Sequence, residues 1–481
     1  MILTTILLTA ICSIPDHPNE IEFAQYLFSP PSPTEYRHEL SNGIPVYLAQ
    51  DTELPLVDIS LIFRGGPYLE SSDKVGLVSM MRKLVRNGGT TSLSAEELDE
   101  QFEFLAAGVT VGGSGETTSA SLNSLSSNFD ESLSLFLDMV KNPGFQQSRI
   151  DLSKDTVIEG LKQRNDHPST ILKRESSNVL YGDSYKGRST TDQMVESFTR
   201  NDFLSMHRRI MNPSNLIIAV SGDFETESML SLLEKAFGDW EFGEVVTTPP
   251  DVVSEFTPGI YYVDQDVSQG GVRLGLRSLR LGDPDVEAAT IMNYILGGGG
   301  FSSRITQTVR SDEGLAYSAG SYFSPGVYMD GVWGAGYESK NKTVALAAAL
   351  IFNEVDTIKN ELVSKEDIEL AKSALVEQFP SIFQSKAQTI GVFVNDELIG
   401  RRPDYWSTYT QKINSITPED VKRVANRILN ENEMALVIVG DWKSISEGTE
   451  RANVEQIQQI IDGPVVELPI RNPLTLEPLT E

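Results

Sequence analysis

The sequence contains very few of the residues that build most disulfide and metal sites. Its 481 residues include one cysteine, Cys12, and four histidines, His17, His38, His167 and His207. A single cysteine cannot form an intrachain disulfide. No two histidines stand three or four positions apart, the spacing that places two ligands on one face of a helix. These counts exclude a disulfide framework and a helical zinc site built on two histidines.

Positive charge is scarce as well. Lysine and arginine number 39 against 68 aspartates and glutamates, so the formal net charge is −29. Such a surface repels phosphate backbones, and we do not expect the protein to bind nucleic acid. It would attract basic peptides, although a solvated acidic surface that keeps the protein soluble is the simpler interpretation. The hydrophobic content of 40% is typical of a globular protein, and the length is enough for several domains.

Long hydrophobic runs are absent except at the N-terminus. Residues 1–14 carry no charged side chain, a stretch that matches the apolar region of a signal peptide and is too short to span a bilayer. Ala10 and Cys12 are small residues that fit a cleavage site before Ser13. We expect residues 1–14 to be a signal peptide and the mature chain, without a transmembrane segment, to be periplasmic or otherwise exported.

The sequence does contain an internal duplication. Residues 199–224 align without a gap on residues 417–442, at an offset of 218, with Thr, Asp, Arg-Ile, Asn and Gly-Asp recurring in place. The same offset places residues 150–154 on residues 368–372. Because one offset serves two separate stretches, we infer that the chain is two copies of one unit.

The matched segments predict the same helix and strand in each copy. Thr199 and Thr417 are predicted N-caps, and Pro418 takes the first helical position, where its missing N–H costs nothing. Continuous apolar runs follow at 216–220 and 434–439 and predict buried strands. His207 lies on the first of these helices and its counterpart is Ala425, so we interpret it as a packing or surface residue, not a ligand.

The start of the first copy combines strand and helix signals. Asn42-Gly43 predicts a hairpin turn, and residues 57–63 alternate apolar and other side chains as a half-buried strand does. Residues 94–105, which open with a capping box at Ser94, and residues 128–141 are predicted helices.

Together these patterns predict an α+β fold with two homologous domains in tandem. The N-terminal domain is predicted to span residues 30–245 and the C-terminal domain residues 259–465. Residues 246–258 between them are rich in proline and valine and are predicted to form a linker.

Several motifs, in their order along the chain, resemble the pitrilysin (insulinase-type) metallopeptidase family. They are Ser41-Asn42-Gly43, Gly65-Gly66 followed by Glu70, the helix from Gly76-Leu77, the glycine run 297–300 followed by Phe-Ser-Ser-Arg304, and Arg310-x6-Tyr317. The resemblance covers roughly residues 36–441. The last two motifs are those of the branch with two domains per chain.

The resemblance implies that this chain has lost the zinc site of the family. The three positions of the signature His-x-x-Glu-His fall on Ser79, Arg82 and Lys83, and the glutamate that supplies the third ligand falls on Gly160, beside Glu159. Serine is a poor zinc ligand, and two cations repel a divalent ion. We therefore expect no metal in this chain and no peptidase activity from the chain alone.

The Arg-x6-Tyr pair of the family is present as Arg310 and Tyr317. The resemblance implies that these side chains donate hydrogen bonds to a peptide substrate across a closed chamber, facing a related subunit that holds zinc. We therefore expect a non-catalytic subunit of a heterodimeric zinc metallopeptidase, with the zinc in the partner.

Two questions stay open at this stage. Gly298, Gly299 and Gly300 could form a substrate-contacting loop, as the resemblance suggests, or a helix C-cap followed by a tight turn. The chain could also be a non-enzymatic scaffold or a peptide-binding relative, and a homodimer that binds peptides without cleaving them is a third reading.

Overall fold

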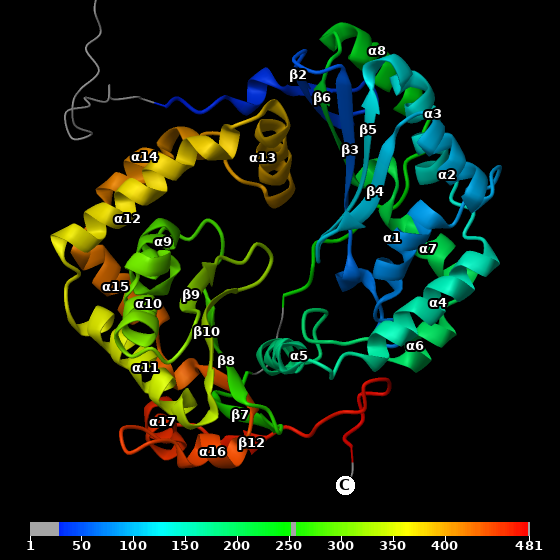
Figure 1. Cartoon of the computed structure of the whole chain (residues 1–481). Coiled ribbons are helices and arrows are strands. Elements are labelled where there is room, and N and C mark those ends of the chain that lie inside the picture. Colours follow the sequence, from blue (N-terminus) through cyan, green and yellow to red (C-terminus); the bar gives the residue numbers. More distant parts are fainter. Residues whose placement is uncertain (1–27, 252–255, 480–481) are drawn as a thin grey trace, which may run out of the picture.

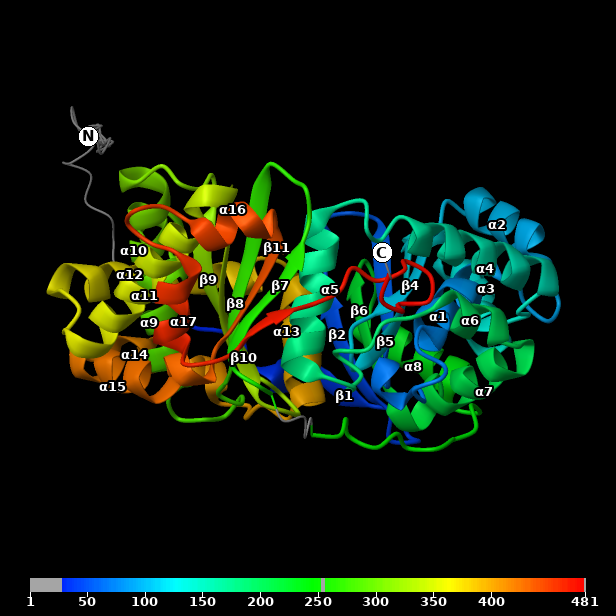
Figure 2. The same ribbon diagram turned by 90° about the horizontal axis from the view of Figure 1, so that it is seen from below.

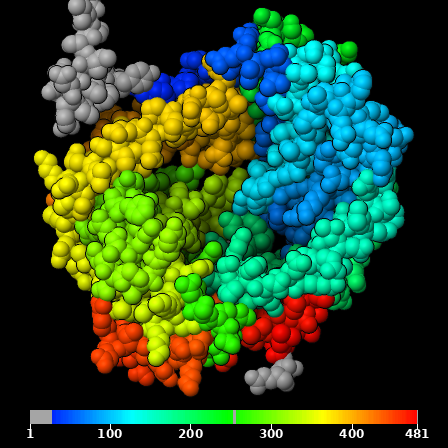
Figure 3. Space-filling model, viewed as in Figure 1, coloured from blue at the N-terminus to red at the C-terminus, as the bar shows by residue number. Residues whose placement is uncertain are grey.

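The computed structural model describes residues 28–251 and 256–479, so the predicted signal peptide lies outside the described residues. The chain folds into two halves, each a β-sheet covered by helices on its outer face (Figures 1 and 2). A hollow separates the two halves in the space-filling view (Figure 3).

Each half contains one six-stranded mixed sheet. The N-terminal sheet has the order β1-β2-β6-β3-β5-β4 and the C-terminal sheet the order β12-β7-β11-β8-β10-β9. The strands are β1 (Arg37–Glu39), β2 (Pro45–Gln50), β3 (Leu56–Arg64), β4 (Gly108–Gly113), β5 (Thr117–Leu125), β6 (Leu216–Gly222), β7 (Gly259–Asp264), β8 (Gln269–Ser278), β9 (Ala319–Ser324), β10 (Gly331–Lys340), β11 (Ala435–Gly440) and β12 (Val465–Glu467).

The two sheets share one topology except at one edge. Strands β2, β6, β3, β5 and β4 correspond in order to β7, β11, β8, β10 and β9. The remaining edge strand β1 forms the predicted hairpin with β2 and runs antiparallel to it, whereas β12 comes last in the chain and runs parallel to β7. The prediction of two homologous α+β domains in tandem is confirmed.

The helices repeat along the chain in the same way. In the N-terminal half they are α1 (Leu77–Asn87), α2 (Ala95–Phe104), α3 (Phe129–Lys141), α4 (Gln147–Lys162), α5 (Pro168–Tyr181), α6 (Asp192–Ser197), α7 (Arg200–Ile210) and α8 (Thr226–Phe237). In the C-terminal half they are α9 (Val286–Asn293), α10 (Arg304–Thr306), α11 (Val344–Asn360), α12 (Lys365–Gln378), α13 (Lys386–Ile399), α14 (Tyr405–Ser415), α15 (Pro418–Ile428), α16 (Trp442–Glu447) and α17 (Val454–Ile461). Helices α4, α5 and α7 begin 218 residues before α12, α13 and α15. Within residues 28–251 and 256–479, none of the helices combines the length and hydropathy needed to span a bilayer.

The predicted helix starts are present. Thr199 and Thr417 both cap their helices, and in each case an aspartate three residues later returns a hydrogen bond to the cap backbone. Ser94 forms the same capping box with Glu97. These caps satisfy N–H groups that would otherwise lack partners in the first helical turn, so local sequence fixes where these three helices begin.

Two helices cross from one half to the other. Helix α5 of the N-terminal half packs on β8 and β11 of the C-terminal sheet, and α13 of the C-terminal half packs on β2 and β6 of the N-terminal sheet (Figure 1). Ile390, Phe393 and Val394 of α13 are buried against the first sheet, while Ile171 and Leu172 of α5 are buried against the second.

This reciprocal exchange explains the burial of the central strands. Strand β3 alternates buried and less buried positions, because the crossing helix leaves part of its inner face open. Every residue of β11, and all but the last residue of β6, is buried. The core helices cover one face of these strands and the crossing helices cover the other.

Polar contacts fix the C-terminal ends of both crossing helices. The Arg64 guanidinium donates to the backbone oxygen of Glu397 in α13 at 3.1 Å, and Arg277 donates to the backbone oxygen of Leu180 in α5 at 3.2 Å. A cation at the C-terminal end of a helix also interacts favourably with the helix dipole. Each sheet therefore holds the other half's helix by an equivalent arginine.

Candidate functional site

The four positions aligned with the family's metal site do not form a metal site in this chain. Ser79 and Lys83 are exposed on α1, and Gly160 is exposed on α4 with open space where a side chain would stand. Among residues 28–251 and 256–479, no group of three or more His, Cys, Asp or Glu side chains is arranged to hold an ion.

Arg82, the fourth of these positions, turns into the protein. Its guanidinium donates to the Thr118 hydroxyl at 3.1 Å and to the backbone oxygens of Ser114 and Thr117 at 3.0 and 2.8 Å. Burial lowers the pKa of Arg82 to about 10, so the group stays charged at neutral pH. The sequence suggested that Arg82 and Lys83 together repel a metal ion. In the structure Arg82 instead anchors the β4–β5 hairpin.

Two further contacts fix the same hairpin and helix. The Glu70 carboxylate accepts from the backbone N–H groups of Gly76 and Val78 at 3.0 and 2.7 Å and so caps the start of α1. Burial raises the pKa of this carboxyl. A Cβ at Gly66 would lie 2.3 Å from the backbone oxygen of Gly115 at the hairpin tip, so only glycine permits this approach.

Arg310 and Tyr317 do come together, and a third residue joins them. The Arg310 guanidinium carbon lies 4.7 Å from the centre of the Tyr317 ring and 4.5 Å from the centre of the Phe301 ring. Tyr317 is 86% exposed and Phe301 is 68% exposed. Within the described chain Arg310 makes no hydrogen bond or ion pair, which leaves the donors of its guanidinium available. We call Phe301, Arg310 and Tyr317 the aromatic–arginine stack.

The two residues of the pair lie on different segments of the backbone. Arg310 lies on a π-helical turn, Gln307–Asp312, and Tyr317 precedes β9. Sequence reasoning missed Phe301 as a site residue. Its position directly after the glycine run was the available signal, because a large aromatic side chain next to four glycines is poorly suited to a buried core.

The glycine run is explained by packing. The helical backbone continues from α9 into the π-helical turn Tyr294–Gly298, and Gly300 takes a left-handed φ of +62°. A Cβ at Gly298 would lie 2.5 Å from the Asn293 amide nitrogen, and one at Gly299 would lie 2.7 Å from the Tyr294 backbone oxygen. The structure thus favours the helix-end interpretation of the run, and the run places Phe301 over Arg310.

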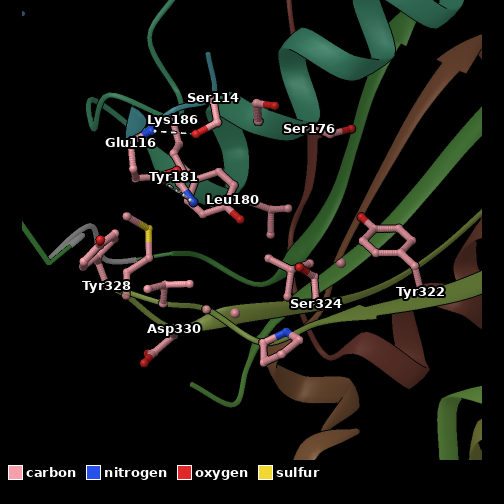
Figure 4. Close-up of a pocket in the computed structure, with 18 of the residues that line it drawn as sticks. Ser114, Glu116, Ser176, Leu180, Tyr181, Lys186, Tyr322, Ser324, Tyr328 and Asp330 are labelled. Carbon is pink, nitrogen blue, oxygen red and sulfur yellow. Dashed lines mark hydrogen bonds and ion pairs between the residues drawn. The ribbon is translucent and has the colours of Figure 1, made fainter. Parts of the chain in front are cut away.

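A cavity of about 600 Å³ lies between the two halves (Figure 4). The β4–β5 hairpin and α5 supply one side of it, and β8, the loop from β9 to β10, and α13 supply the other. The metal-aligned positions and the aromatic–arginine stack are not among the residues that line it. The cavity is therefore a second feature of the inner surface, separate from the predicted site.

The cavity carries hydrogen-bonding groups and balanced charge. Burial raises the pKa values of Tyr181, Tyr322 and Tyr328, so these phenols stay neutral donors. Glu116 pairs with Lys186 at 3.5 Å. The described lining residues include no histidine and no cysteine. Such a lining suits binding of a polar chain better than acid–base or nucleophilic chemistry.

Sequence comparisons match most of the chain to one peptidase family. Residues 46–193 match the family model described as insulinase (peptidase family M16), and residues 197–375 match the one described as the peptidase M16 inactive domain. An uncharacterized zinc protease of Rickettsia bellii is 25% identical over 409 residues, which cover 83% of this chain and 96% of that protein. A Helicobacter pylori protein named non-peptidase homolog YmxG is 22% identical over 408 residues, 83% of this chain and 92% of that protein.

Solved structures show the same fold. A peptidase M16 inactive domain from Pseudomonas fluorescens superimposes with a TM-score of 0.75 at 22% identity, over 84% of this chain and 97% of that chain. A protease from Helicobacter pylori superimposes with a TM-score of 0.74 at 19% identity, over 86% and 100% of the two chains.

Proposed function

Since this chain belongs to the insulinase family of peptidases (M16), we propose that it is the non-catalytic subunit of a two-chain zinc peptidase. In this proposal it positions a peptide substrate in a closed chamber, and a related partner subunit holds the zinc and activates the attacking water. Arg310 and Tyr317 donate hydrogen bonds to the substrate near the scissile bond.

The aromatic–arginine stack carries the proposal. Phe301 and Tyr317 expose large apolar surfaces, and exposed tyrosine, phenylalanine and arginine are the residues that dominate binding energy when a partner covers them. In a chain with a net charge of −29, Arg310 has no carboxylate partner within the described residues. Its planar donors are therefore free for an oxygen that a ligand supplies.

The two aromatic rings give the guanidinium a fixed orientation. The ring centres of Phe301 and Tyr317 lie 4.5 and 4.7 Å from the guanidinium carbon of Arg310, and both contacts restrain its rotation. A donor that is already oriented before substrate binds loses less conformational entropy and stabilises developing charge more effectively. Phe301 is proposed as a positioning residue, because it acts through Arg310.

The contacts that α1 makes through Arg82 support the non-catalytic role. Arg82 binds the β4–β5 hairpin, and the hairpin carries Glu116 to the wall of the cavity between the halves. The helix that bears the metal ligands in catalytic relatives thus serves to shape the inner surface here.

A peptide-binding relative that takes no part in cleavage is the second candidate. The cavity between the halves favours it, because its neutral phenols and its charged groups could hold a polypeptide without any catalytic partner. The two candidates differ in whether Arg310 affects a reaction rate.

Co-expression with a related chain that bears His-x-x-Glu-His tests the proposal. The purified pair is expected to cleave peptides in a chelator-sensitive manner, and Arg310→Ala is expected to lower kcat/KM by about 100-fold or more. Arg402→Ala is the matched control, because the Arg402 side chain is 82% exposed and pairs with Asp404 in the same half. Cleavage that survives Arg310→Ala at the wild-type rate, or cleavage by this chain alone, would refute the proposal.

Export remains part of the proposal and rests on residues 1–14. Cell fractionation with N-terminal sequencing of the mature chain tests it, and a cytoplasmic protein that starts at Met1 would contradict it.

A further inference from the structure

A second pocket, of about 460 Å³, lies in the N-terminal half next to the crossing helix α5. It is bounded by α5, by the segment from Asp183 to Thr191 that follows it, by Ser72 before α1, and by the C-terminal tail at Arg471. Figure 2 shows this tail running from β12 across to the N-terminal half. The proposed function uses none of these residues.

Three arginines line the pocket: Arg174, Arg188 and Arg471. Glu175 is buried between two of them, with Arg174 at 2.8 Å and Arg471 at 3.6 Å. Asp183 lies exposed and is the only other acidic residue among the described lining. Charge around the pocket is therefore positive, in a chain whose net charge is −29.

Two of the arginines retain donors without partners. The Arg174 side chain is 10% exposed, and its Nη2 atom is buried with no hydrogen-bond acceptor. The Arg188 side chain makes no hydrogen bond or ion pair to any described residue. A buried donor without an acceptor is unfavourable, so an acceptor supplied by a ligand would be favourable here.

The second copy of the duplication fills the same place with aromatic rings. At the offset of 218, Glu175 corresponds to Phe393 and Arg188 corresponds to Trp406. Phe383 packs against both rings, with centroids 6.0 and 5.8 Å away. The fold itself therefore does not require a pocket at this position. In the N-terminal copy, charged residues replace the rings and leave an open, positively charged space.

We infer that this pocket binds a phosphate group, either as inorganic phosphate or on a small phosphate ester. Guanidinium groups bind phosphate oxygens through paired, charge-assisted hydrogen bonds. Ser72, Ser189 and Thr191 also line the pocket and add hydroxyl donors. Phosphate offers more acceptor oxygens and more negative charge than a carboxylate, so it suits three arginines and three hydroxyls better.

Phosphate in this pocket would also hold the C-terminal tail against the N-terminal half. The tail already contacts the N-terminal half, because Asn165 donates to the backbone oxygen of Arg471 at 2.7 Å and Asp192 N–H donates to that of Leu474 at 3.2 Å. An anion held between Arg188 and Arg471 would strengthen this docking, so bound phosphate is expected to protect the tail from proteolysis.

Calorimetric titration of the full chain with inorganic phosphate at constant ionic strength tests the inference. Saturable binding is expected for phosphate and for glycerol phosphate, and at least about tenfold weaker binding for acetate at the same pH. Equal affinity for acetate would overturn the choice of phosphate, and absence of saturable phosphate binding would overturn the site.

The Arg188→Ala variant locates the site without disturbing the buried Glu175 pair. We expect its dissociation constant for phosphate to rise at least about tenfold, because a charge-assisted contact is lost, and Arg188→Lys to lie between it and the wild type. Arg402→Ala, which changes an equally charged group far along the chain, should bind as the wild type does. Phosphate affinity unchanged in Arg188→Ala, or lowered equally by Arg402→Ala, would refute this site whatever the outcome of the peptidase assay.

Discussion

The two halves share strands and crossing helices but differ in the helix that follows the corresponding strands β3 and β8. In the N-terminal half this helix, α1, has eleven residues, is capped by Glu70 and anchors a hairpin through Arg82. In the C-terminal half α9 has eight residues, gives way to a π-helical turn, and leads to the exposed aromatic–arginine stack.

The difference shows which parts of a duplicated fold are free to change. Strands β6 and β11 are covered on both faces, so a substitution there disturbs packing on two sides. Helix α1 has exposed positions, Ser79 and Lys83, that can change at little cost, whereas no residue of α9 is exposed. The exposed groups that differ between the halves, Ser79 and Lys83 on α1 and the aromatic–arginine stack beyond α9, lie outside these doubly covered strands.

The charged pocket beside α5 extends the same contrast. A crossing helix must bury one face against the opposite sheet, and α5 does so with Ile171 and Leu172, whereas α13 uses Phe393 as well as aliphatic residues. Phe393 and its counterpart Glu175 show that the same helix position can hold an aromatic ring in one half and an ion-paired carboxylate in the other.

The largest expected effect is that of Arg82→Glu, which puts the family's acidic residue back on α1. A carboxylate at this place would face the backbone oxygens of Ser114 and Thr117 with no donor, and we expect a loss of about 4 kcal/mol in the free energy of unfolding. Urea unfolding measures it. Lys83→Glu, at the next and exposed position, should stay within about 0.5 kcal/mol of the wild type; equal losses in the two variants would show that Arg82 is not an anchor.

A smaller effect on stability is expected when the pH is lowered, because His207 becomes protonated. Its counterpart in the second half is Ala425. Its Nε2 lies 2.8 Å from the Val140 backbone oxygen, and burial lowers the pKa of His207 to about 4. In the unfolded chain the pKa of this histidine is about 6.5. The contribution of neutral His207 to the free energy of unfolding is therefore fully present above about pH 6.5. It declines by about 3 kcal/mol in total as the pH falls toward 4.

Urea unfolding at several pH values measures this decline. His207→Ala should remove it, leaving a shallower dependence on pH between 6.5 and 4 even if the variant is less stable at neutral pH. An unchanged slope in the variant would assign the decline to other groups.

The smallest expected effect is symmetrical between the halves. Thr199→Ala and Thr417→Ala each remove one capping box of identical geometry, and each should cost about 1 kcal/mol. Thr199→Ser and Thr417→Ser keep the hydroxyl and serve as controls. Clearly unequal losses in the two alanine variants would show that the halves differ in stability at this conserved start of the repeat helix.

The sequence by itself determined the architecture. The offset of 218, the capping residues and the apolar runs established two α+β units, because caps and hydrophobic periodicity are local properties. The absence of metal ligands at Ser79, Arg82, Lys83 and Gly160, and the presence of Arg310 and Tyr317, were also evident from residue identity.

Tertiary structure alone decided what these residues contact. No local pattern shows that Arg82 turns inward to the β4–β5 hairpin, that Phe301 lies over Arg310, or that the tail brings Arg471 to the pocket that Arg188 lines. Each of these contacts joins segments brought together by chain packing, and the exchange of α5 and α13 between the halves determines which faces of the sheets remain open. That is why the sequence predicted the scaffold and two of the three residues of the stack, while the cavity and the charged pocket required the folded chain.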